Sequence, residues 1–158
     1  MDTLLKVLED NATLTPAQLA VMLDKEEGDI KKMIEDFEAR GVILGYTTII
    51  DWDKTDTEYV NALIELKVTP RVGSGYDEIA ERIYNYPEVE SVYLMSGGYD
   101  LTVMLRGKTM REVAIFVAAK LATIEAVTST ATHFVLRKYK DHNVIFGGAP
   151  VDERGNIL

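Results

Sequence analysis

A short polar turn and a run of threonines are the groups best suited to binding a small molecule. The glycines of the turn permit close backbone approach and positive φ, and its aspartate is a hydrogen-bond acceptor. A hairpin turn also needs glycines for geometry alone, and threonines are ordinary in strands, so both interpretations stay open. The turn comprises Ser96, Gly97, Gly98, Tyr99 and Asp100, and the threonines are Thr128, Thr130 and Thr132.

Basic side chains in the first third of the chain are candidates for phosphate contacts, which supply most of the affinity of proteins for nucleic acid. The charge balance opposes this role, because the chain has a net charge of −9 and residues 1–54 hold six basic against twelve acidic side chains. The run Glu26-Glu27-Gly28-Asp29 favours the start of a helix, but its carboxylates would face a negative groove. The candidates are Lys25, Lys31, Lys32, Arg40 and Lys54.

Residues for catalysis or metal binding are scarce. The absence of cysteine excludes a disulfide framework, a thiolate metal site and a cysteine nucleophile, and it suits a reducing cytoplasm. His133 and His142 lack a metal-type spacing and are better explained as surface or structural residues. No Ser-His-Asp set, phosphate loop or HExxH motif is present. We therefore expect no enzyme, no metal and no cofactor.

The chain shows no targeting or membrane segment. Its first residues are amphipathic and acidic, unlike a signal peptide. The longest apolar window, Val113–Leu121, includes Lys120 and is too short to cross a bilayer. We expect a soluble, cytoplasmic protein without membrane contact.

The first fifty residues predict helices joined by a tight turn. Apolar residues between Leu4 and Leu8 have helical spacing, and Thr15-Pro16-Ala17-Gln18 predicts a capping box at the start of a second helix. Asp24, with Glu27 three residues on, predicts the cap of a third helix that ends at Gly41. Such a close pair of helices indicates a helix-turn-helix. The β-branched run at 42–51 predicts a strand and a wing.

The rest of the chain predicts an α/β sandwich in the order β-α-β-β-α-β, the split βαβ of ferredoxin-like folds. Both helices then cover one face of the sheet. The other face must pack against something, and we expect a second copy of the chain. The predicted strands span 60–68, 89–95, 101–105 and 127–138, and the predicted helices span 76–86 and 109–121.

Two sets of motifs resemble the Lrp/AsnC (leucine-responsive, feast/famine) family of transcriptional regulators. The segment Phe37-Glu38-Ala39-Arg40-Gly41-Val42-Ile43, followed by Gly45-Tyr46, is similar to the LExxGxI-x-GY signature of its DNA-binding domain. The second half resembles its regulatory (RAM) domain at Val89-x-x-Val92, Gly98-Tyr99-Asp100-Leu101 and Val127-Thr128-Ser129-Thr130-Ala131-Thr132. Together the two resemblances cover nearly all of residues 3–140.

The resemblance implies an α+β protein with a winged helix-turn-helix at 1–50, a hinge at 51–59 and a ferredoxin-like effector and oligomerisation domain at 60–140. We expect 141–158 to be an extended arm. It further implies binding to double-stranded DNA, a homodimer assembling into a tetramer or octamer, and an amino-acid or similar effector. In such relatives the effector binds around the turn equivalent to Ser96–Asp100 and the start of the last strand.

The chain departs from the family at Glu26-Glu27-Gly28-Asp29, where relatives usually have small hydroxyl residues and then arginines. The departure leaves an alternative function open. The chain is then a metabolite-sensing oligomer with weakened or lost DNA binding that acts through a protein partner.

Overall fold

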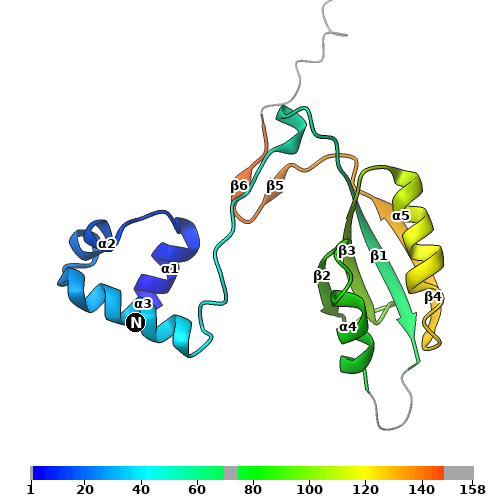
Figure 1. Ribbon diagram of the computed structural model, residues 1–158, viewed down its shortest axis with the longest axis horizontal. Helices are drawn as coiled ribbons and strands as arrows, with labels where there is room; N and C mark the ends of the chain where they lie inside the picture. The colour runs from blue at the N-terminus through cyan, green and yellow to red at the C-terminus, as the bar shows by residue number, and fades with distance from the viewer. Residues whose placement is uncertain (1, 70–74, 148–158) are drawn as a thin grey trace, which may run out of the picture. The chain divides into compact units, whose positions relative to one another are not determined.

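The computed structural model describes residues 2–69 and 75–147, which form two compact units (Figure 1). The first unit comprises the chain up to Ile50 together with Lys140–Ile145. The second unit runs from Asp51 to Tyr139 and resumes at Phe146. Each unit has its own apolar core, so each is described separately below.

Three helices form the first unit: α1 (Asp2–Asp10), α2 (Pro16–Leu23) and α3 (Glu27–Ala39). Each helix contributes one apolar stripe to a shared core, as amphipathic helices do. The buried residues are Leu4, Leu8, Leu19, Ala20, Ile30 and Phe37. Leu4 and Leu8 are four residues apart and Ile30 and Phe37 seven apart, the spacings that place residues on one face of a helix.

The ends of α2 and α3 show which local signals were correct. The capping box is confirmed, because the Thr15 hydroxyl accepts from the Gln18 N–H at 3.3 Å and Gln18 Oε1 accepts from the Thr15 N–H at 2.8 Å. Gly41 follows α3 with φ +66°, the left-handed geometry predicted for it.

The predicted cap at Asp24 is wrong. Asp24 ends α2 instead, in a left-handed conformation (φ 50°, ψ 54°), and its N–H donates to the Ala20 carbonyl. Glu26 is the residue before α3, and its side chain makes no capping hydrogen bond. Aspartate tolerates left-handed geometry better than most residues, which is why the same residue type suits either helix end.

The predicted wing strand is also wrong, because residues 42–50 form no strand in the described structure. The chain leaves α3 through hydrogen bonds from the Val42 and Ile43 N–H groups to the Phe37 carbonyl. Leu44 is then 93% exposed and Tyr46 54% exposed. β-branched and aromatic residues favour strands because they pack on a paired, half-buried surface, and this segment has no such pairing.

The second unit is a four-stranded antiparallel sheet with two helices. It contains β1 (Val60–Val68), α4 (Asp77–Tyr84), β2 (Val89–Leu94), β3 (Leu101–Gly107), α5 (Met110–Phe116) and β4 (Val127–Phe134). A five-residue π-helical segment, η2 (Val117–Leu121), continues α5. The strands lie in the order β2-β3-β1-β4, and the element order is the predicted one. The last strand ends at Phe134, earlier than the predicted Lys138.

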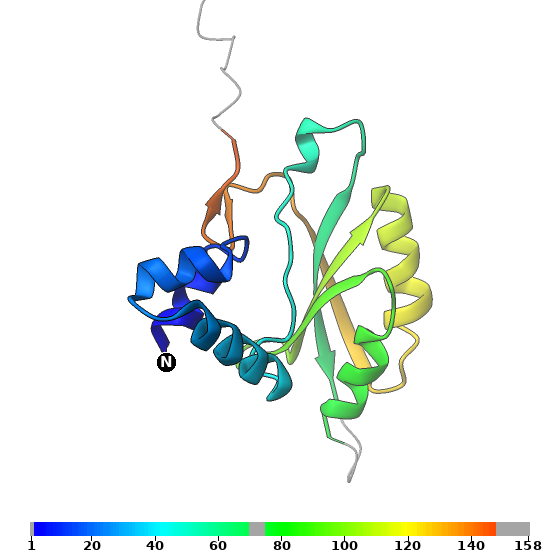
Figure 2. The same cartoon turned by 60° about the vertical axis from the view of Figure 1, so that its left-hand side comes forward.

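Both helices lie on one face of this sheet (Figure 2). Beneath them the buried side chains of β1 and β3 alternate, as a strand with one covered face requires. These core residues are Ala62, Ile64, Leu66, Val68, Leu101, Val103 and Leu105, with Ile79, Ile83, Val113, Phe116, Val117 and Leu121 from the helical segments. The intervening residues, such as Leu63 opposite Met104, point to the other face, which no described helix of this unit covers.

A short hairpin follows the sheet, where an extended arm was predicted from residue 141. It consists of β5 (Lys140–Asp141) and β6 (Val144–Ile145). His142 and Asn143 both have positive φ, at 43° and 64°, as a two-residue type I′ turn requires. The remainder of the predicted arm, 148–158, lies outside the described residues. Residues 70–74, between the predicted strand at 60–68 and the predicted helix at 76–86, also lie outside the described residues.

The predicted hinge at 51–59 contains a 3-10 turn, η1 (Trp52–Lys54). The Trp52 ring meets the Tyr59 ring edge-on, with 5.0 Å between centroids. The Arg106 guanidinium lies 5.1 Å from the Tyr59 ring, and Arg106 also pairs with Glu90. These contacts hold the segment against the end of β3.

Two properties of the described residues bear on wider function. None of the helices at 2–69 or 75–147 is long and apolar enough to cross a membrane. Over the same residues, no group of three histidine or acidic side chains converges in a way that would hold a metal ion.

Candidate functional site

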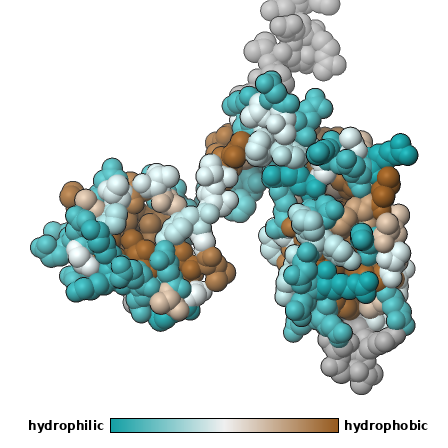
Figure 3. All heavy atoms as spheres, viewed as in Figure 1, coloured by the Kyte–Doolittle hydropathy of each residue, from teal (hydrophilic) through white to brown (hydrophobic). Residues whose placement is uncertain are grey.

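One face of helix α3 is exposed to solvent and contains basic, acidic and small residues. Ile30 and Phe37 are buried and Met33 and Ile34 are half-buried, so the opposite side of the helix faces outward. At 100° per residue, the outward stripe consists of Gly28, Lys32, Glu35 and Ala39, all exposed. The surface over α3 is mostly hydrophilic (Figure 3).

Ion pairs with acids of the same helix occupy both flanks of that stripe. Lys31 Nζ lies 2.6 Å from Glu27 Oε1, and Arg40 Nη2 lies 2.8 Å from Asp36 Oδ2. All four side chains are about half exposed, and such surface pairs contribute only about 0.2–1 kcal/mol. The pairs therefore cancel charge locally, and both basic groups remain able to exchange to another anion.

The five basic candidates do not all lie together. Lys25 lies in the turn between α2 and α3, where its N–H donates to the Ala20 carbonyl at 3.0 Å. Lys31, Lys32 and Arg40 belong to α3 or its C-cap. Lys54 is in the second unit, on η1, with its Nζ 3.2 Å from Asp51 Oδ2.

Tyr46 follows α3 in the chain and contacts the last turn of this helix. Its hydroxyl donates to Glu38 Oε1 at 2.9 Å. Burial raises the pKa of Tyr46 above its ordinary value, and the hydrogen bond and charge of Glu38 raise it further. The contact ties the segment after α3 back to the helix.

The β2–β3 turn is fastened to the end of β1. The Met95 N–H donates to the Asp100 carbonyl at 2.8 Å, and the Asp100 N–H donates to the Leu66 carbonyl at 2.9 Å. Asp100 Oδ2 accepts from the Val68 N–H at 2.8 Å. One of the predicted ligand groups thus has a structural role in joining two strands.

Lys67 is a residue of this region that the sequence did not single out. Its Nζ donates to the Gly98 carbonyl at 3.0 Å, and its own carbonyl accepts from the Thr128 hydroxyl at 3.2 Å. Lys67 therefore links the turn to the start of β4. A lone lysine in a strand gives no signal of such a role, because it depends on the register of three strands.

The structure brings only part of the predicted effector set together. Ser96, Gly97 and Gly98 are exposed on the turn, with Tyr99 and Asp100 half-buried beside them. Thr128 reaches this group through Lys67. Thr130 and Thr132 lie opposite Leu66 and Ile64 in register, so they share the helix-covered face of the sheet and do not join Lys67.

The glycines at 97 and 98 are not required by the fold around them. Neither has positive φ, and a Cβ added at either position would meet nothing within 4 Å. The interpretation that a hairpin needs them for geometry alone therefore has no support in the described structure. Gly28 on α3 shares this property, with open space where its Cβ would be.

The comparisons with known proteins converge on one group. Residues 61–145 match the family described as the Lrp/AsnC ligand binding domain. The chain is 46% identical over 152 residues to the uncharacterized HTH-type transcriptional regulator YugG of Bacillus subtilis, covering 96% of this chain and 92% of that protein. It is 29% identical to the HTH-type transcriptional regulator FL11 of Pyrococcus horikoshii, over 87% of this chain and 88% of the relative.

A solved structure extends the similarity to the fold. A transcriptional regulator of Neisseria meningitidis, crystallised as an L-Met complex, matches with a TM-score of 0.72 and 20% identity. The match covers 87% of this chain and 88% of that one.

Proposed function

Because the chain belongs to the Lrp/AsnC family of transcriptional regulators, we propose that it binds double-stranded DNA and that a small-molecule effector controls this binding. Residues 1–50 form the DNA-binding helix-turn-helix domain and 51–59 the hinge. Residues 60–140 form a ferredoxin-like effector and oligomerisation domain. The effector is an amino acid or a similar metabolite, and the protein acts in the cytoplasm.

The observation that carries the DNA-binding proposal is the geometry of α2, the turn and α3. With Asp24 in a left-handed conformation, only three residues separate the end of α2 from the start of α3, the compact connection of a helix-turn-helix. Residues at the start of the second helix in such motifs contact base edges. Gly28 lies there on the outward stripe, and its missing side chain leaves the backbone open to a close approach.

Basic residues supply the phosphate contacts in this proposal. Lys25 and Lys32 have no ion pair among the described residues, and Lys31 and Arg40 hold only weak exposed pairs. A dimer presents two such sets. Phosphates then replace Glu27 and Asp36 as partners of Lys31 and Arg40, and Lys54 adds a contact from the second domain.

The effector site of this proposal is the turn Ser96–Asp100 with Thr128. The N–H groups of Gly97 and Gly98 hold a ligand carboxylate, since glycine has no side chain that would hinder a close approach to the backbone. Asp100 uses Oδ2 for the Val68 N–H, and its Oδ1 accepts from a ligand ammonium group. Thr130 and Thr132 lie on the helix-covered face of the sheet, so any hydrogen bond that they make to the effector comes from that face. The L-Met complex of the Neisseria relative supports an amino acid as the ligand class.

In this proposal two copies of the chain associate through the uncovered face of the sheet. Tyr93 is 55% exposed there, next to Thr102 in register, and Leu63 lies beside Met104. A sheet with one apolar core face and a second face of this composition packs against another sheet at about 10 Å. Two copies of the chain stacked by these faces form the dimer, which assembles further into a tetramer or octamer.

A second candidate function follows from the acids of α3. Glu27, Asp29, Glu35, Asp36 and Glu38 are the acids of this helix, and carboxylates oppose phosphate contacts. In this alternative the first unit has weakened or lost DNA affinity and binds a basic protein surface instead.

Mobility-shift assays at low salt separate the two functions. The probe is double-stranded DNA from upstream of the protein's own coding region, assayed with and without the twenty amino acids. A shift that one amino acid strengthens or weakens supports the regulator. No shift at any protein concentration, with a folded first domain, supports the protein-binding alternative.

A further inference from the structure

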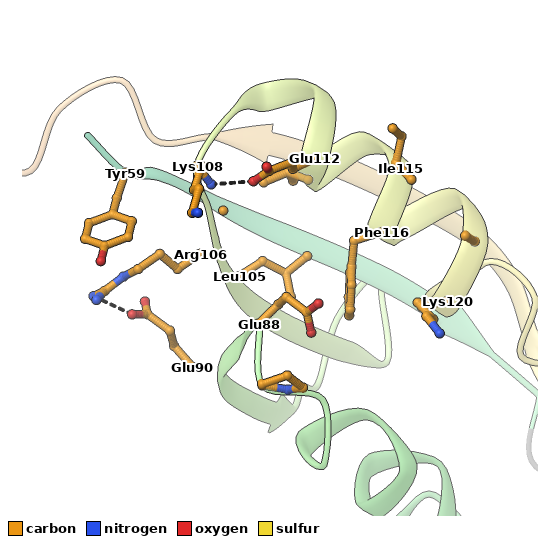
Figure 4. A pocket seen from close by; sticks show the side chains of 14 residues that line it. Tyr59, Glu88, Glu90, Leu105, Arg106, Lys108, Glu112, Ile115, Phe116 and Lys120 are labelled. Carbon is orange, nitrogen blue, oxygen red and sulfur yellow. Dashed lines mark hydrogen bonds and ion pairs between the residues drawn. The ribbon is translucent and has the colours of Figure 1, made fainter. Parts of the chain in front are cut away.

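We propose that the second unit contains an additional small-molecule site, which takes a small carboxylate with an apolar body. The site is a cavity of about 630 Å³ between α5 and the adjoining ends of β2 and β3 (Figure 4). Ligand pockets of small molecules span roughly 300–1,000 Å³. All residues that line the cavity belong to the second unit.

The inner wall of the cavity is apolar. Leu105, Val113 and Phe116 are buried. Gly107 brings the end of β3 against α5, because a Cβ there would lie 2.9 Å from Val113 Cγ2. Ile115, more than half exposed, extends this wall outward. The surface suits a branched aliphatic or aromatic group.

Charged side chains surround this apolar wall, and two of the acids already have partners. Glu90 pairs with Arg106, and Glu112 Oε2 accepts from the Lys108 backbone N–H at 2.8 Å. The ammonium group of Lys108 and the carboxylate of Glu88 form no ion pair within residues 2–69 and 75–147, and Figure 4 shows both at the cavity. Both groups are therefore available to a ligand.

These charges define the ligand class. The Lys108 ammonium, with Lys120 across the cavity, receives a carboxylate. Glu88 receives an ammonium group when the ligand has one. A simple carboxylic acid and an α-amino acid share the required chemistry, and Glu88 distinguishes them.

The cavity is separate from the proposed effector turn. The turn ends at Asp100, immediately before β3, whereas the cavity lies at the Arg106–Lys108 end of the same strand. Seven strand residues span roughly 20 Å. None of the lining residues belongs to Ser96–Asp100 or to the threonines of β4.

A natural reporter lies beside the cavity. Trp52 is the single tryptophan of the chain, and its ring contacts Tyr59, which lines the cavity. Arg106 lies near both rings, at 5.9 Å from Trp52 and 5.1 Å from Tyr59. Occupancy that shifts Arg106 or Tyr59 will change tryptophan fluorescence.

The test titrates the full chain with 4-methylpentanoate, L-leucine and 3-methylbutylamine, followed by tryptophan fluorescence and calorimetry. We expect each of the two carboxylates to saturate this cavity at one molecule per chain, and the amine not to bind there. Lys108→Ala weakens both carboxylates about tenfold, the effect of removing one charged hydrogen bond. Glu88→Gln weakens only L-leucine at this site. Arg111→Ala, a charge-matched change on α5 away from the lining, leaves binding unchanged.

Two further variants locate the site. Ala119→Trp fills the cavity from an exposed position of η2 and abolishes binding of 4-methylpentanoate. Asp100→Asn, which keeps the oxygen acceptor for the Val68 N–H, leaves that binding intact. The proposal is overturned if 4-methylpentanoate fails to saturate the wild-type chain, if Lys108→Ala binds it normally, or if Asp100→Asn abolishes its binding. Loss of DNA binding or of effector control alone would overturn the proposed function and leave this site standing.

Discussion

Asp100 Oδ2 accepts a hydrogen bond from the Val68 backbone N–H at 2.8 Å, and this bond ties the β2–β3 turn to the end of β1. Asp100 therefore has a structural role and, in our proposal, a ligand role. The two roles use different oxygens of the same carboxylate. Substitutions at this position can separate them.

Asp100→Ala is expected to lower the free energy of unfolding of the second unit by about 1–3 kcal/mol, because the part-buried Val68 N–H loses its acceptor. Asp100→Asn keeps an oxygen acceptor and should cost much less. Both variants should lose most of their affinity for the amino-acid effector, since both lack the negative charge. Chemical denaturation and calorimetry measure the two effects. If Asp100→Asn binds the effector like the wild type, Asp100 is only structural.

Gly28→Ala is expected to stabilise the first unit by about 0.5 kcal/mol, because alanine has the higher helix propensity and its Cβ meets open space. The same change should weaken DNA binding if a phosphate or base edge approaches the backbone at Gly28. Thermal unfolding and DNA titration measure both. If Gly28→Ala raises the stability and leaves the DNA affinity unchanged, DNA does not approach the backbone at Gly28.

The Glu38 contact predicts a pH dependence at the end of α3. Burial and Glu38 raise the pKa of Tyr46. The Tyr46 hydroxyl therefore holds its proton more strongly in the folded protein than in the unfolded chain. This stabilisation is fully present below the ordinary tyrosine pKa of about 10 and is lost as the pH rises through the higher folded-state value. Tyrosine 13Cζ NMR should show Tyr46 titrating late.

In Glu38→Gln the Tyr46 pKa should move back toward its ordinary value, because the negative charge is gone. Tyr46→Phe identifies the resonance and should remove this part of the alkaline stability loss. An unchanged Tyr46 titration in Glu38→Gln would show that burial alone sets the pKa.

The uncovered face of the sheet predicts self-association. Met104→Asp places a charge beside Leu63 in register, and a buried unpaired charge strongly opposes packing. Light scattering should show a dimer or larger assembly for the wild type and a monomer for this variant. Ala114→Asp, the same charge change at an exposed position of α5, is the matched control. A variant that remains assembled would move the interface to another surface.

Local signals in the sequence predicted local structure well. The Thr15–Gln18 capping box and the left-handed Gly41 follow from residues within one turn of each other. The buried stripes of α3, β1 and β3 follow from spacing alone. Asp24 failed because an aspartate suits a helix start and a left-handed helix end equally, and the sequence does not choose between them.

Features that depend on a distant partner were not predictable in this way. The run at 42–50 has strand-forming residues, yet a strand requires a second strand beside it. Lys67 meets Gly98 and Thr128 only because three strands align. Thr130 and Thr132 looked equivalent to Thr128, but the register places them on the helix-covered face. The irregularity at Lys67/Val68 that separates them has no sequence signature.

DNA affinity measured against salt concentration tests the central claim most directly. Fluorescence anisotropy with a labelled duplex should give binding that falls steeply with salt, with the logarithmic slope set by the number of phosphates neutralised. Lys32→Ala removes an outward cation of α3 and should reduce the slope by roughly 0.9 for each phosphate that Lys32 neutralises. Lys6→Ala, the same charge change on α1, should leave the slope unaltered. A folded wild-type protein that binds no duplex at the lowest salt, or equal slopes for the two variants, would contradict DNA recognition by α3.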